Sequence, residues 1–340
     1  MIDNLDRWLH SNKIFYKKNY ELRYSSWIKA GGVIKNYIMP ESIEQCVCLI
    51  KHLNINNIQF YILGNQSNTI IRDGTIITPI INLSKMNKLS FVESEIGTNV
   101  YCESGVSIPR FAKNIIKKGF TGTEGLLGIP GSIGGAICMN ASSYGNEVTT
   151  YLSSIRIIDE TGNIIDLEKE KLNLSWRNSL IKDKKLLVMY AKFFIPKNKY
   201  IGEKLATTNS LKIINHRKTF QENNLPNLGS IFATKNIYKD LSKKNFMFLF
   251  VYLLYKLLSV YYFNFNKKKL NIFREKFVKL YLKLLGLEKY KNFSSSSKTL
   301  NCLVNKGTNS TKEAIEFLKQ FEKQSKNCLN LENIILNEID

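Results

Sequence analysis

A glycine-rich stretch from Gly122 to Tyr144, reading GTEGLLGIPGSIGGAICMNASSY, constrains this chain more than any other part of its sequence. Six of the nineteen glycines and one of the six prolines fall in the fifteen residues from Gly122 to Ala136. Because glycine costs conformational entropy on folding, a dense run indicates a backbone that turns tightly or approaches a ligand closely. A Pro-Gly step followed by Gly-Gly favours a loop whose N–H groups face an anion such as a phosphate.

A flexible linker is the plain alternative for this stretch. Flexible linkers are rich in glycine and serine and carry little apolar bulk. Here the glycines are interleaved with Leu126, Leu127, Ile129 and Ile133. The pattern therefore favours an ordered loop.

The composition is that of a globular protein large enough for more than one core. The 340 residues are 44% hydrophobic and 23% charged. The six cysteines form no CxxC pair and the three histidines are far apart in sequence, so we expect reduced thiols and no metal site. The first twenty residues carry charges throughout and lack the apolar run of a secretory signal, which favours a cytoplasmic location.

The net charge of +21 is concentrated in one part of the chain. Between Lys235 and Thr299, fifteen Lys or Arg residues stand against three acidic residues. Nucleic acid, an anionic membrane surface and a nucleotide-linked substrate are all partners of the matching charge. We find no nucleic-acid-binding motif and no platform of interleaved basic and aromatic residues, so we expect no nucleic-acid partner.

Alternating apolar runs and amphipathic segments predict a mixed α/β region over residues 22–197, after a basic, loosely helical lead-in at residues 1–21. Strands are expected at KNYIMP, IQFYILG, TIITPIINL, NVYCESG, YLSSIRIIDE and LLVMYAKFFI. Helices are expected at SIEQCVCLIKHLN, with Ser42 as its N-cap, and from Pro109 to Lys118. Residues 198–340 are expected to form a smaller α+β domain that opens with a helix at LATTNSLKIINHRKTFQ and ends strand, helix, strand.

Taken together, these motifs resemble those of the UDP-N-acetylenolpyruvoylglucosamine reductases, flavoenzymes of peptidoglycan precursor synthesis. The glycine-rich stretch and the segments LGNQSNTIIRDG, SWRNSLIKDKKLLVMYAKF and NLGSIFATKN match the family's motifs. The resemblance covers about residues 22–235 and 284–338. It implies an α+β fold with a two-part FAD-binding region of the PCMH/vanillyl-alcohol-oxidase type, followed by a smaller substrate-binding domain.

The resemblance implies FAD and NADPH as cofactors and a UDP-sugar substrate whose enolpyruvyl ether is reduced to the lactyl ether of UDP-N-acetylmuramate. Backbone N–H groups in two glycine-rich turns suit the pyrophosphate of FAD. The family's cofactor-binding positions correspond to Gly64, Asn65, Gln66, Ser67, Asn68, Gly128, Ile129, Pro130, Gly131, Ser132, Gly134, Gly135, Asn140 and Tyr144.

Three catalytic residues are also implied by the resemblance. Negative charge develops on the substrate's vinyl carbon and carboxylate during the reduction, which requires a cation and a proton donor. Arg177 corresponds to the carboxylate-binding arginine, whose fork suits a carboxylate better than lysine does. Ser230 corresponds to the proton-donating serine, and Glu332 to the acidic residue that stabilises the same enol.

Two positions depart from the family pattern. Trp176 stands where the family usually has tyrosine, and Thr299 stands where a histidine is common. These departures leave two alternatives open. One is a paralogue that reduces another enolpyruvyl sugar for a surface polysaccharide, and the other is an inactive flavin-binding homologue.

A helical insertion at about residues 236–276 interrupts the C-terminal domain. It contains FMFLFVYLLYKLLSVYYFNF, which is long enough to span a membrane and is flanked by Lys243, Lys244 and Lys267 to Lys269. A single span would place Ser230 and Glu332 on opposite sides of the membrane, so we reject it for an active enzyme.

The next segment, LNIFREKFVKLYLKLLGL, is expected to be an amphipathic helix with one apolar face, formed by Ile272, Phe273, Phe277, Leu280 and Leu284. Two alternatives stay open for the insertion: a helical hairpin packed on the protein or a partner, and a peripheral contact of residues 246–285 with an anionic membrane. The sequence carries no signal for an oligomeric state.

Overall fold

The structure is a computed structural model that describes residues 2–184, 186–265, 269–325 and 328–336. The chain forms two compact units and crosses between them several times. Unit 1 consists of Met1–Tyr20, Ile34–Asn65 and Thr75–Arg217, and unit 2 of Glu21–Val33, Gln66–Gly74 and Lys218–Asp340. The sequence boundary expected at residue 197 therefore falls inside unit 1, and two short N-terminal segments contribute to unit 2.

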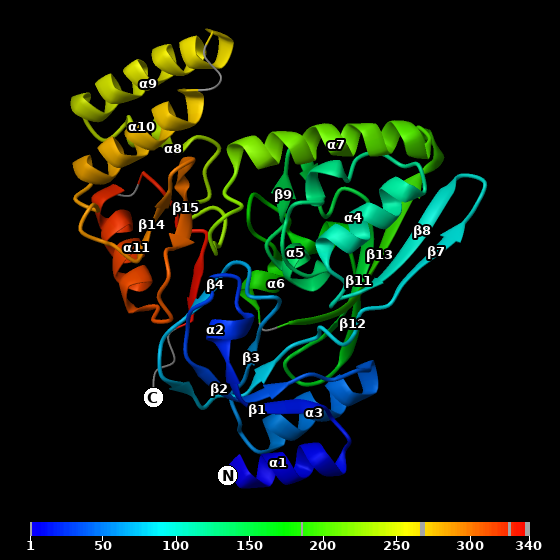
Figure 1. Ribbon diagram of the computed structural model, residues 1–340. Coiled ribbons are helices and arrows are strands. Elements are labelled where there is room, and N and C mark those ends of the chain that lie inside the picture. Colours follow the sequence, from blue (N-terminus) through cyan, green and yellow to red (C-terminus); the bar gives the residue numbers. More distant parts are fainter. Residues whose placement is uncertain (1, 185, 266–268, 326–327, 337–340) are drawn as a thin grey trace. The chain divides into compact units, whose positions relative to one another are not determined.

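The first sheet of unit 1 has the strand order β1-β2-β6-β3, with β5 paired to β2. Its strands are β1 Tyr16–Glu21, β2 Val33–Ile38, β3 Tyr61–Ile62, β5 Thr75–Ile76 and β6 Ile80–Ile81. The β2, β6 and β3 strands are parallel. Helices α1 (Ile2–Ser11) and α3 (Ile43–Ile55) lie beside this sheet (Figure 1), and their apolar residues share a core with it.

The N-terminal lead-in is an integral part of unit 1. Leu5 and Leu9 of α1 are 1% and 0% exposed, because their spacing of four residues places both on the inner side of the helix. Ser42 caps α3 as expected, since its Oγ accepts a hydrogen bond from the N–H of Gln45. The expected strand at TIITPIINL is instead two short strands, because Pro79 between them has no N–H for the ladder.

The second sheet of unit 1 is antiparallel, in the order β12-β11-β13-β8-β7. Its strands are β7 Leu89–Glu93, β8 Gly97–Glu103, β11 Leu152–Ile158, β12 Ile164–Glu168 and β13 Leu187–Pro196. Helices α4 (Ile108–Lys117) and α5 (Ile133–Cys138) pack on it, where Phe111 and Ile133 join Phe193 in a second core. The strands expected for β8, β11 and β13 and the helix expected for α4 are confirmed.

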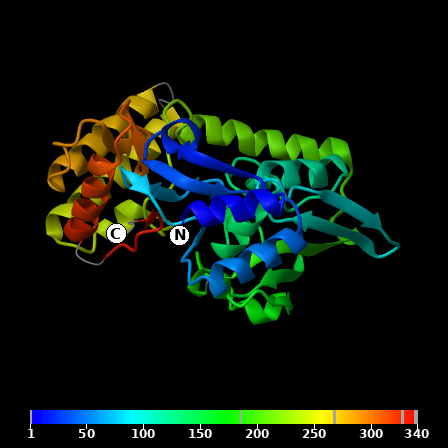
Figure 2. The same ribbon diagram turned by 90° about the horizontal axis from the view of Figure 1, so that it is seen from below.

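Shorter elements and one long helix complete unit 1. The short ones are η1 Glu124–Leu126, β9 Ser142–Ser143, β10 Asn146–Glu147, η2 Lys169–Leu172, α6 Leu180–Asp183 and η3 Lys197–Lys199. The long helix is α7 (Glu203–Phe220), the lime-green ribbon of Figures 1 and 2, as the sequence predicts. Its residues up to Arg217 belong to unit 1 and the last turn belongs to unit 2.

In the part of unit 2 that the structure describes, there are two small sheets and five helices. An antiparallel hairpin joins β14 (Phe293–Ser296) to β15 (Thr299–Asn305), and β4 (Thr69–Ile71) pairs in parallel with β16 (Ile334–Leu336). The helices are α2 Leu22–Ser25, α8 Ile237–Leu241, α9 Phe246–Phe265, α10 Leu270–Leu284 and α11 Lys312–Ser325. The expected order of strand, helix and strand at the end of the chain is confirmed.

The expected insertion contains α8, α9 and the first half of α10, and α9 and α10 lie side by side in Figure 1. Lys267 and Lys268 of the expected basic flank lie outside the described residues. Of the predicted apolar face, Phe273 and Phe277 are buried, whereas Ile272 and Leu280 are 55% and 37% exposed. The reason is that the buried side of α10 is centred on the Leu270–Phe273–Phe277–Tyr281 stripe.

Candidate active site

The first part of the glycine-rich stretch is held in place by hydrogen bonds within unit 1. The Glu124 carboxylate accepts from the N–H of Gly122 (2.7 Å) and the hydroxyl of Thr121 (2.6 Å). The N–H of Gly125 donates to Oδ1 of Asn146 (2.7 Å). A Cβ on Gly125 would lie 2.1 Å from the carbonyl oxygen of Ser143, so this position accepts only glycine. The stretch is therefore an ordered loop, as its interleaved apolar residues predict.

The two expected pyrophosphate-binding turns meet at Gly64. A Cβ on Gly64 would lie 3.3 Å from Oγ of Ser132 and 4.0 Å from Cα of Gly135. Gly64, which follows β3, therefore faces the start of α5. A Cβ on Gly135 would meet only Oγ of Ser132, at 3.5 Å, which is an ordinary van der Waals distance. The fold itself therefore leaves room for a methyl group at Gly135. This opening beside backbone N–H groups fits the close approach of a pyrophosphate.

Other positions of the loop serve the packing of the fold. The N–H groups of Ile133 and Gly134 donate to the carbonyls of Val106 (2.9 Å) and Ser104 (3.0 Å), which ties α5 to the chain after β8. A Cβ on Gly134 would lie 1.9 Å from Oγ of Ser104. Gly134 thus allows α5 to approach Ser104 closely, and this packing role does not depend on a cofactor.

A half-buried arginine near the end of α7, which the sequence reasoning missed, binds the same loop. Arg217 donates from Nη2 to the carbonyl of Gly125 (2.6 Å) and to Oγ of Ser143 (2.5 Å), and from Nη1 to the carbonyl of Gly128 (3.2 Å). Burial lowers the pKa of the Arg217 guanidinium from its ordinary value. Its position places a positive charge under the expected anion site. The basic run His216-Arg217-Lys218 was the available signal.

Tyr144 joins this cluster from the loop between β9 and β10. Its hydroxyl lies 2.8 Å from Nδ1 of His216, and the Arg217 guanidinium lies 4.8 Å from the centre of its ring. Burial raises the pKa of the Tyr144 hydroxyl, and the charge of Arg217 opposes this in part. Tyr144, an expected cofactor-binding residue, is therefore fixed to the same helix end that holds the glycine loop.

Arg177 lies in a tight turn between Ser175 and Asn178, whose backbones pair with each other. The turn is tied to the chain after α5, because Asn140 donates from Nδ2 to the carbonyl of Ser175 (3.0 Å). The guanidinium of Arg177 donates to the carbonyl of Ser142 (3.2 Å). The fold of unit 1 thus brings Arg177 beside the expected cofactor residue Asn140.

Four expected site residues have left-handed backbone conformations. Gln66, Asn140, Tyr144 and Arg177 have φ values of 57°, 40°, 50° and 58°. Such values are uncommon for side chains other than asparagine and glycine, and they cost free energy that the surrounding structure must supply. Positive φ values also occur outside the expected site, at Lys13, Asn19, Lys29, Asn57 and Asn173.

Ser230 and Glu332 lie on neighbouring segments of unit 2. The N–H of Glu332 donates to the carbonyl of Ile231 (2.8 Å), and Phe232 forms a bridge with Leu331. Phe232 and Ile231 are fully buried, so the half-buried Ser230 is attached to a rigid core. Unit 2 therefore brings together two expected catalytic residues that are about a hundred positions apart in the chain.

Two asparagines link these two segments to the first glycine-rich turn. Nδ2 of Asn333 donates to Oδ1 of Asn68 (2.8 Å) and to the carbonyl of Ser230 (3.1 Å). Nδ2 of Asn68 donates to the carbonyl of Glu332 (2.9 Å), and the N–H of Ile334 donates to the carbonyl of Asn68 (2.9 Å). Asn68 was expected to hold the cofactor, and its side chain also holds both catalytic segments. Asn333 was missed, although it directly follows Glu332.

Trp176 and Thr299, the two positions that depart from the family pattern, each contact a residue near the expected site. Trp176 is 48% exposed, and the guanidinium of Arg177 lies 5.1 Å from its ring, within the range of a cation–π contact. Thr299 begins β15, and its hydroxyl accepts from the N–H of Asn301 (3.3 Å). Asn301 in turn bonds the N–H and the carbonyl of Phe232 (2.8 and 3.0 Å). Thr299 therefore supports the segment that carries Ser230.

Within the described ranges, no group of three or more His, Cys, Asp or Glu side chains is arranged to hold a metal ion. Arg177 belongs to unit 1, and Ser230 and Glu332 belong to unit 2.

Comparisons with known proteins identify a domain family and related sequences. The model of the FAD binding domain family matches residues 34–168. The UDP-N-acetylenolpyruvoylglucosamine reductase of Clostridium novyi is 36% identical over 216 residues, which are 64% of this chain and 68% of the relative. That of Clostridium tetani is 34% identical over 233 residues, or 68% of this chain and 72% of the relative.

A solved structure matches nearly the whole chain. The crystal structure of UDP-N-acetylenolpyruvylglucosamine reductase from Thermus caldophilus has a TM-score of 0.68 at 17% identity and covers 95% of this chain and 100% of its own. This likeness confirms the expected fold, an FAD-binding region followed by a smaller α+β part. The FAD domain and the named relatives confirm an FAD-dependent oxidoreductase. The chain belongs to the UDP-N-acetylenolpyruvoylglucosamine reductase family.

Proposed function

We propose that this protein uses NADPH to reduce the enolpyruvyl ether of UDP-N-acetylglucosamine enolpyruvate to the lactyl ether of UDP-N-acetylmuramate. The names of the relatives support this substrate. The product supplies peptidoglycan precursor synthesis, and both substrate and product are water-soluble sugar nucleotides. The enzyme accordingly works in the cytoplasm.

The proposed FAD site lies where the two glycine-rich turns meet. Gly64 and Gly135 would let the pyrophosphate approach the backbone, and Asn65 to Asn68 and Gly128 to Ser132 would surround it. Arg217 would add a positive charge through the loop that it holds. When bound, FAD supplies the redox chemistry that connects NADPH to the sugar.

Arg177 binds the carboxylate of the enolpyruvyl group in this proposal. Negative charge develops on that carboxylate and on the adjacent carbon during the reduction, and the guanidinium fork stabilises it with two parallel hydrogen bonds. The left-handed backbone at Arg177 and its bond to the Ser142 carbonyl keep the side chain in one orientation. A preorganised cation needs no rearrangement at the moment of reaction.

Ser230 donates the proton to the substrate carbon that carries the developing charge. Glu332 stabilises the enol form of the substrate from the neighbouring segment. The observation that carries this assignment is the backbone bond between Glu332 and Ile231, which sets the two side chains on adjacent, mutually bonded segments. This arrangement of the two segments supports a shared role in protonation.

The test is an assay of NADPH oxidation that depends on added enolpyruvyl sugar nucleotide, in protein that carries stoichiometric FAD. We expect turnover with UDP-N-acetylglucosamine enolpyruvate and a loss of about 100- to 10,000-fold in kcat for Ser230→Ala, the usual worth of a general acid. Ser90→Ala, an exposed serine on β7, is the matched control and should retain full activity.

The rival functions give different outcomes in the same assay. Turnover only with another enolpyruvyl sugar nucleotide would assign the protein to a surface-polysaccharide paralogue, a role that the Trp176 departure favours. FAD-loaded protein that turns over none of the sugars would be an inactive flavin-binding homologue. Activity of Ser230→Ala equal to that of the parent would refute the proton-donor role alone.

A further inference from the structure

One side of α9 is an exposed apolar surface. Ten large hydrophobic residues of this helix are 38–81% exposed: Phe246, Met247, Leu249, Phe250, Leu253, Leu254, Leu257, Val260, Tyr261 and Phe263. The helix is long and apolar enough to cross a membrane, and only 11% of Phe246–Phe263 is buried. Water-exposed apolar surface of this extent is rare on soluble proteins and marks an interaction site. We call these ten residues the α9 face.

The opposite side of α9 is bound to the rest of unit 2. Phe248 is 1% and Val251 8% exposed, and Tyr252, Tyr255, Leu258 and Tyr262 pack against the same core. Tyr255 and Tyr262 each stack on Phe273 of α10, with ring centres 5.7 and 4.7 Å apart. A lone membrane span would have to give up these aromatic contacts. The α9 helix is therefore a docked helix whose outer face alone is available.

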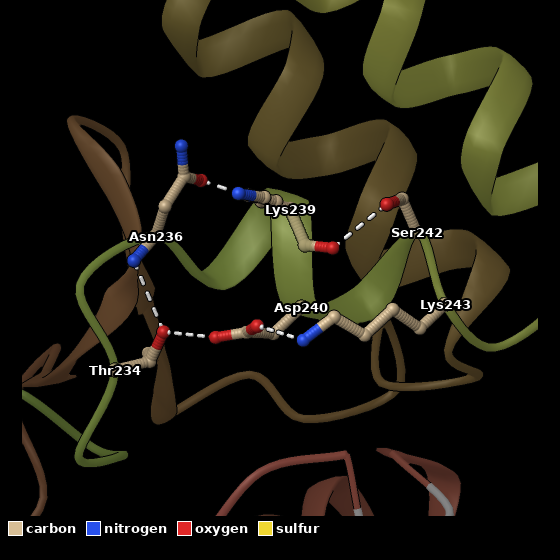
Figure 3. Close-up of polar contacts among 6 residues, drawn as sticks. All are labelled: Thr234, Asn236, Lys239, Asp240, Ser242 and Lys243. Atoms are coloured by element: carbon tan, nitrogen blue, oxygen red, sulfur yellow. Dashed lines mark hydrogen bonds and ion pairs between the residues drawn. The ribbon is translucent and has the colours of Figure 1, made fainter.

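The α8 helix, which precedes α9, is held by a polar network shown in Figure 3. Asn236 caps α8 through the N–H of Lys239 (3.1 Å), and the Asp240 carboxylate accepts from Thr234 and binds Lys243 (2.8 Å). Ser242 donates to the carbonyl of Lys239 (2.7 Å) at the end of the helix. The rings of Tyr238 on α8 and Tyr255 on α9 lie 4.5 Å apart, so α8 contributes to the docking of α9 in unit 2.

The charges near the α9 face are mainly positive, and Glu275 on α10 is paired with Lys279 (2.7 Å). The sequence has no acidic residue between Asp240 and Glu275, a stretch that contains seven Lys or Arg residues. Lys256 is exposed at the edge of the face, and Lys276 and Lys283 are exposed on α10. Lysine side chains at the border of an apolar helix face extend their ammonium groups to the headgroup layer. An apolar face with a basic border is complementary to an anionic phospholipid surface.

We propose that the α9 face docks the protein, without crossing, onto a bilayer that contains anionic phospholipid. The face would lie about 5–10 Å deep, at the boundary between headgroups and acyl chains. A second copy of the chain is the less suitable occupant, because pairing two α9 faces would bring their basic borders together. The proposal is independent of the reaction that the enzyme catalyses.

The experiment is co-sedimentation of the FAD-loaded full chain with vesicles of phosphatidylcholine alone or of an equimolar phosphatidylcholine and phosphatidylglycerol mixture. We expect binding to the anionic vesicles that weakens as salt is added. Phe250, Leu253 and Leu257 lie at the centre of the face, and their joint replacement by serine should lower the affinity at least about tenfold. Lys256→Glu should weaken binding to the anionic vesicles and not to phosphatidylcholine.

The matched control replaces Ile55 and Ile96 of unit 1, which are 81% and 73% exposed, by serine. This variant loses exposed apolar surface outside the α9 face and should bind vesicles like the parent. Thermal unfolding and flavin content should be the same in all the variants, since every changed side chain is exposed. A failure of the parent to bind either vesicle would overturn the proposal. So would a triple variant that binds like the parent, or a parent dimer that the triple variant converts to a monomer without any vesicle binding.

Discussion

The side-chain amide of Asn68 donates a hydrogen bond to the backbone carbonyl of Glu332 at 2.9 Å, across 264 positions of sequence. Through Asn333, the same side chain also reaches the carbonyl of Ser230. A residue of the first glycine-rich turn thus holds the two proposed catalytic segments of unit 2 in register. Asn68 is therefore a positioning residue for the proposed chemistry as well as a candidate contact of FAD.

Replacing Asn68 by alanine should lower kcat more than it lowers FAD affinity. The change removes two partly buried hydrogen bonds that hold the catalytic segments. We expect kcat to fall by about 10- to 100-fold, which equals about 1.4–2.7 kcal/mol. Steady-state kinetics and flavin fluorescence titration separate the two effects. Asn333→Ala should give the same pattern. Loss of FAD with unchanged kcat per bound flavin would show that Asn68 acts through the cofactor alone.

Gly135→Ala separates a cofactor contact from a folding requirement. The new methyl group would lie 3.5 Å from Oγ of Ser132, and alanine favours the helix by about 1 kcal/mol over glycine. We expect an apoprotein with an unchanged or raised Tm and an FAD affinity reduced by about tenfold or more, because the methyl group occupies the pyrophosphate's approach. Gly125→Ala is the contrasting variant and should destabilise the apoprotein, since its Cβ would lie 2.1 Å from a carbonyl oxygen. Unchanged FAD binding in Gly135→Ala would place the pyrophosphate elsewhere.

Arg217→Lys should weaken FAD binding even though the charge is kept. Lysine lacks the planar fork that lets Arg217 bond Gly125, Gly128 and Ser143 together. We expect the FAD dissociation constant to rise about tenfold, with a lower Tm, in fluorescence titration and thermal unfolding. Lys218→Arg, the next residue, is the control. If only Arg217→Ala weakens FAD binding and Arg217→Lys does not, the charge matters and the fork does not.

The stability of unit 2 should depend on the ionisation of Glu222. Burial raises the pKa of this carboxyl, but hydrogen bonds from Ser296 and from the N–H groups of Asn224 and Leu225 outweigh it, so the pKa lies below its ordinary value of 4.5. A carboxyl whose folded-state pKa is lowered stabilises the fold above its ordinary pKa, and this contribution is lost as the pH falls through the lowered value.

Glu222→Gln should therefore flatten the dependence of the unfolding free energy on pH below about 4.5, measured by denaturant titration at several pH values. The parent and the variant should converge at the acid end and differ at neutral pH. The exposed Glu95→Gln is the control and should follow the parent throughout. Parallel curves for parent and Glu222→Gln would contradict the assignment.

Local sequence patterns determined much of the fold and of the candidate site. The Ser42 cap and the apolar spacing after it predicted α3, and the sequence patterns of α4, α7 and α11 predicted those helices, because a helix is specified by residues three and four positions apart. Likewise, the dense glycines predicted an ordered loop with a close backbone approach, and Gly125 and Gly135 have that geometry. The order of the motifs also indicated the family that the comparisons confirm.

Only the tertiary structure decided which distant segments meet. The bonds of Asn68 to Glu332 and of Arg217 to Gly125 join residues far apart in the chain, and no local period encodes such pairs. The same holds for the faces of α9 and α10, where both sides of α9 are apolar and Ile272 and Phe273 are neighbours in sequence. Hydrophobicity alone does not determine which of these residues is buried. Which of them is buried depends on where the rest of unit 2 packs, so Phe273 is in the core and Ile272 is in solvent.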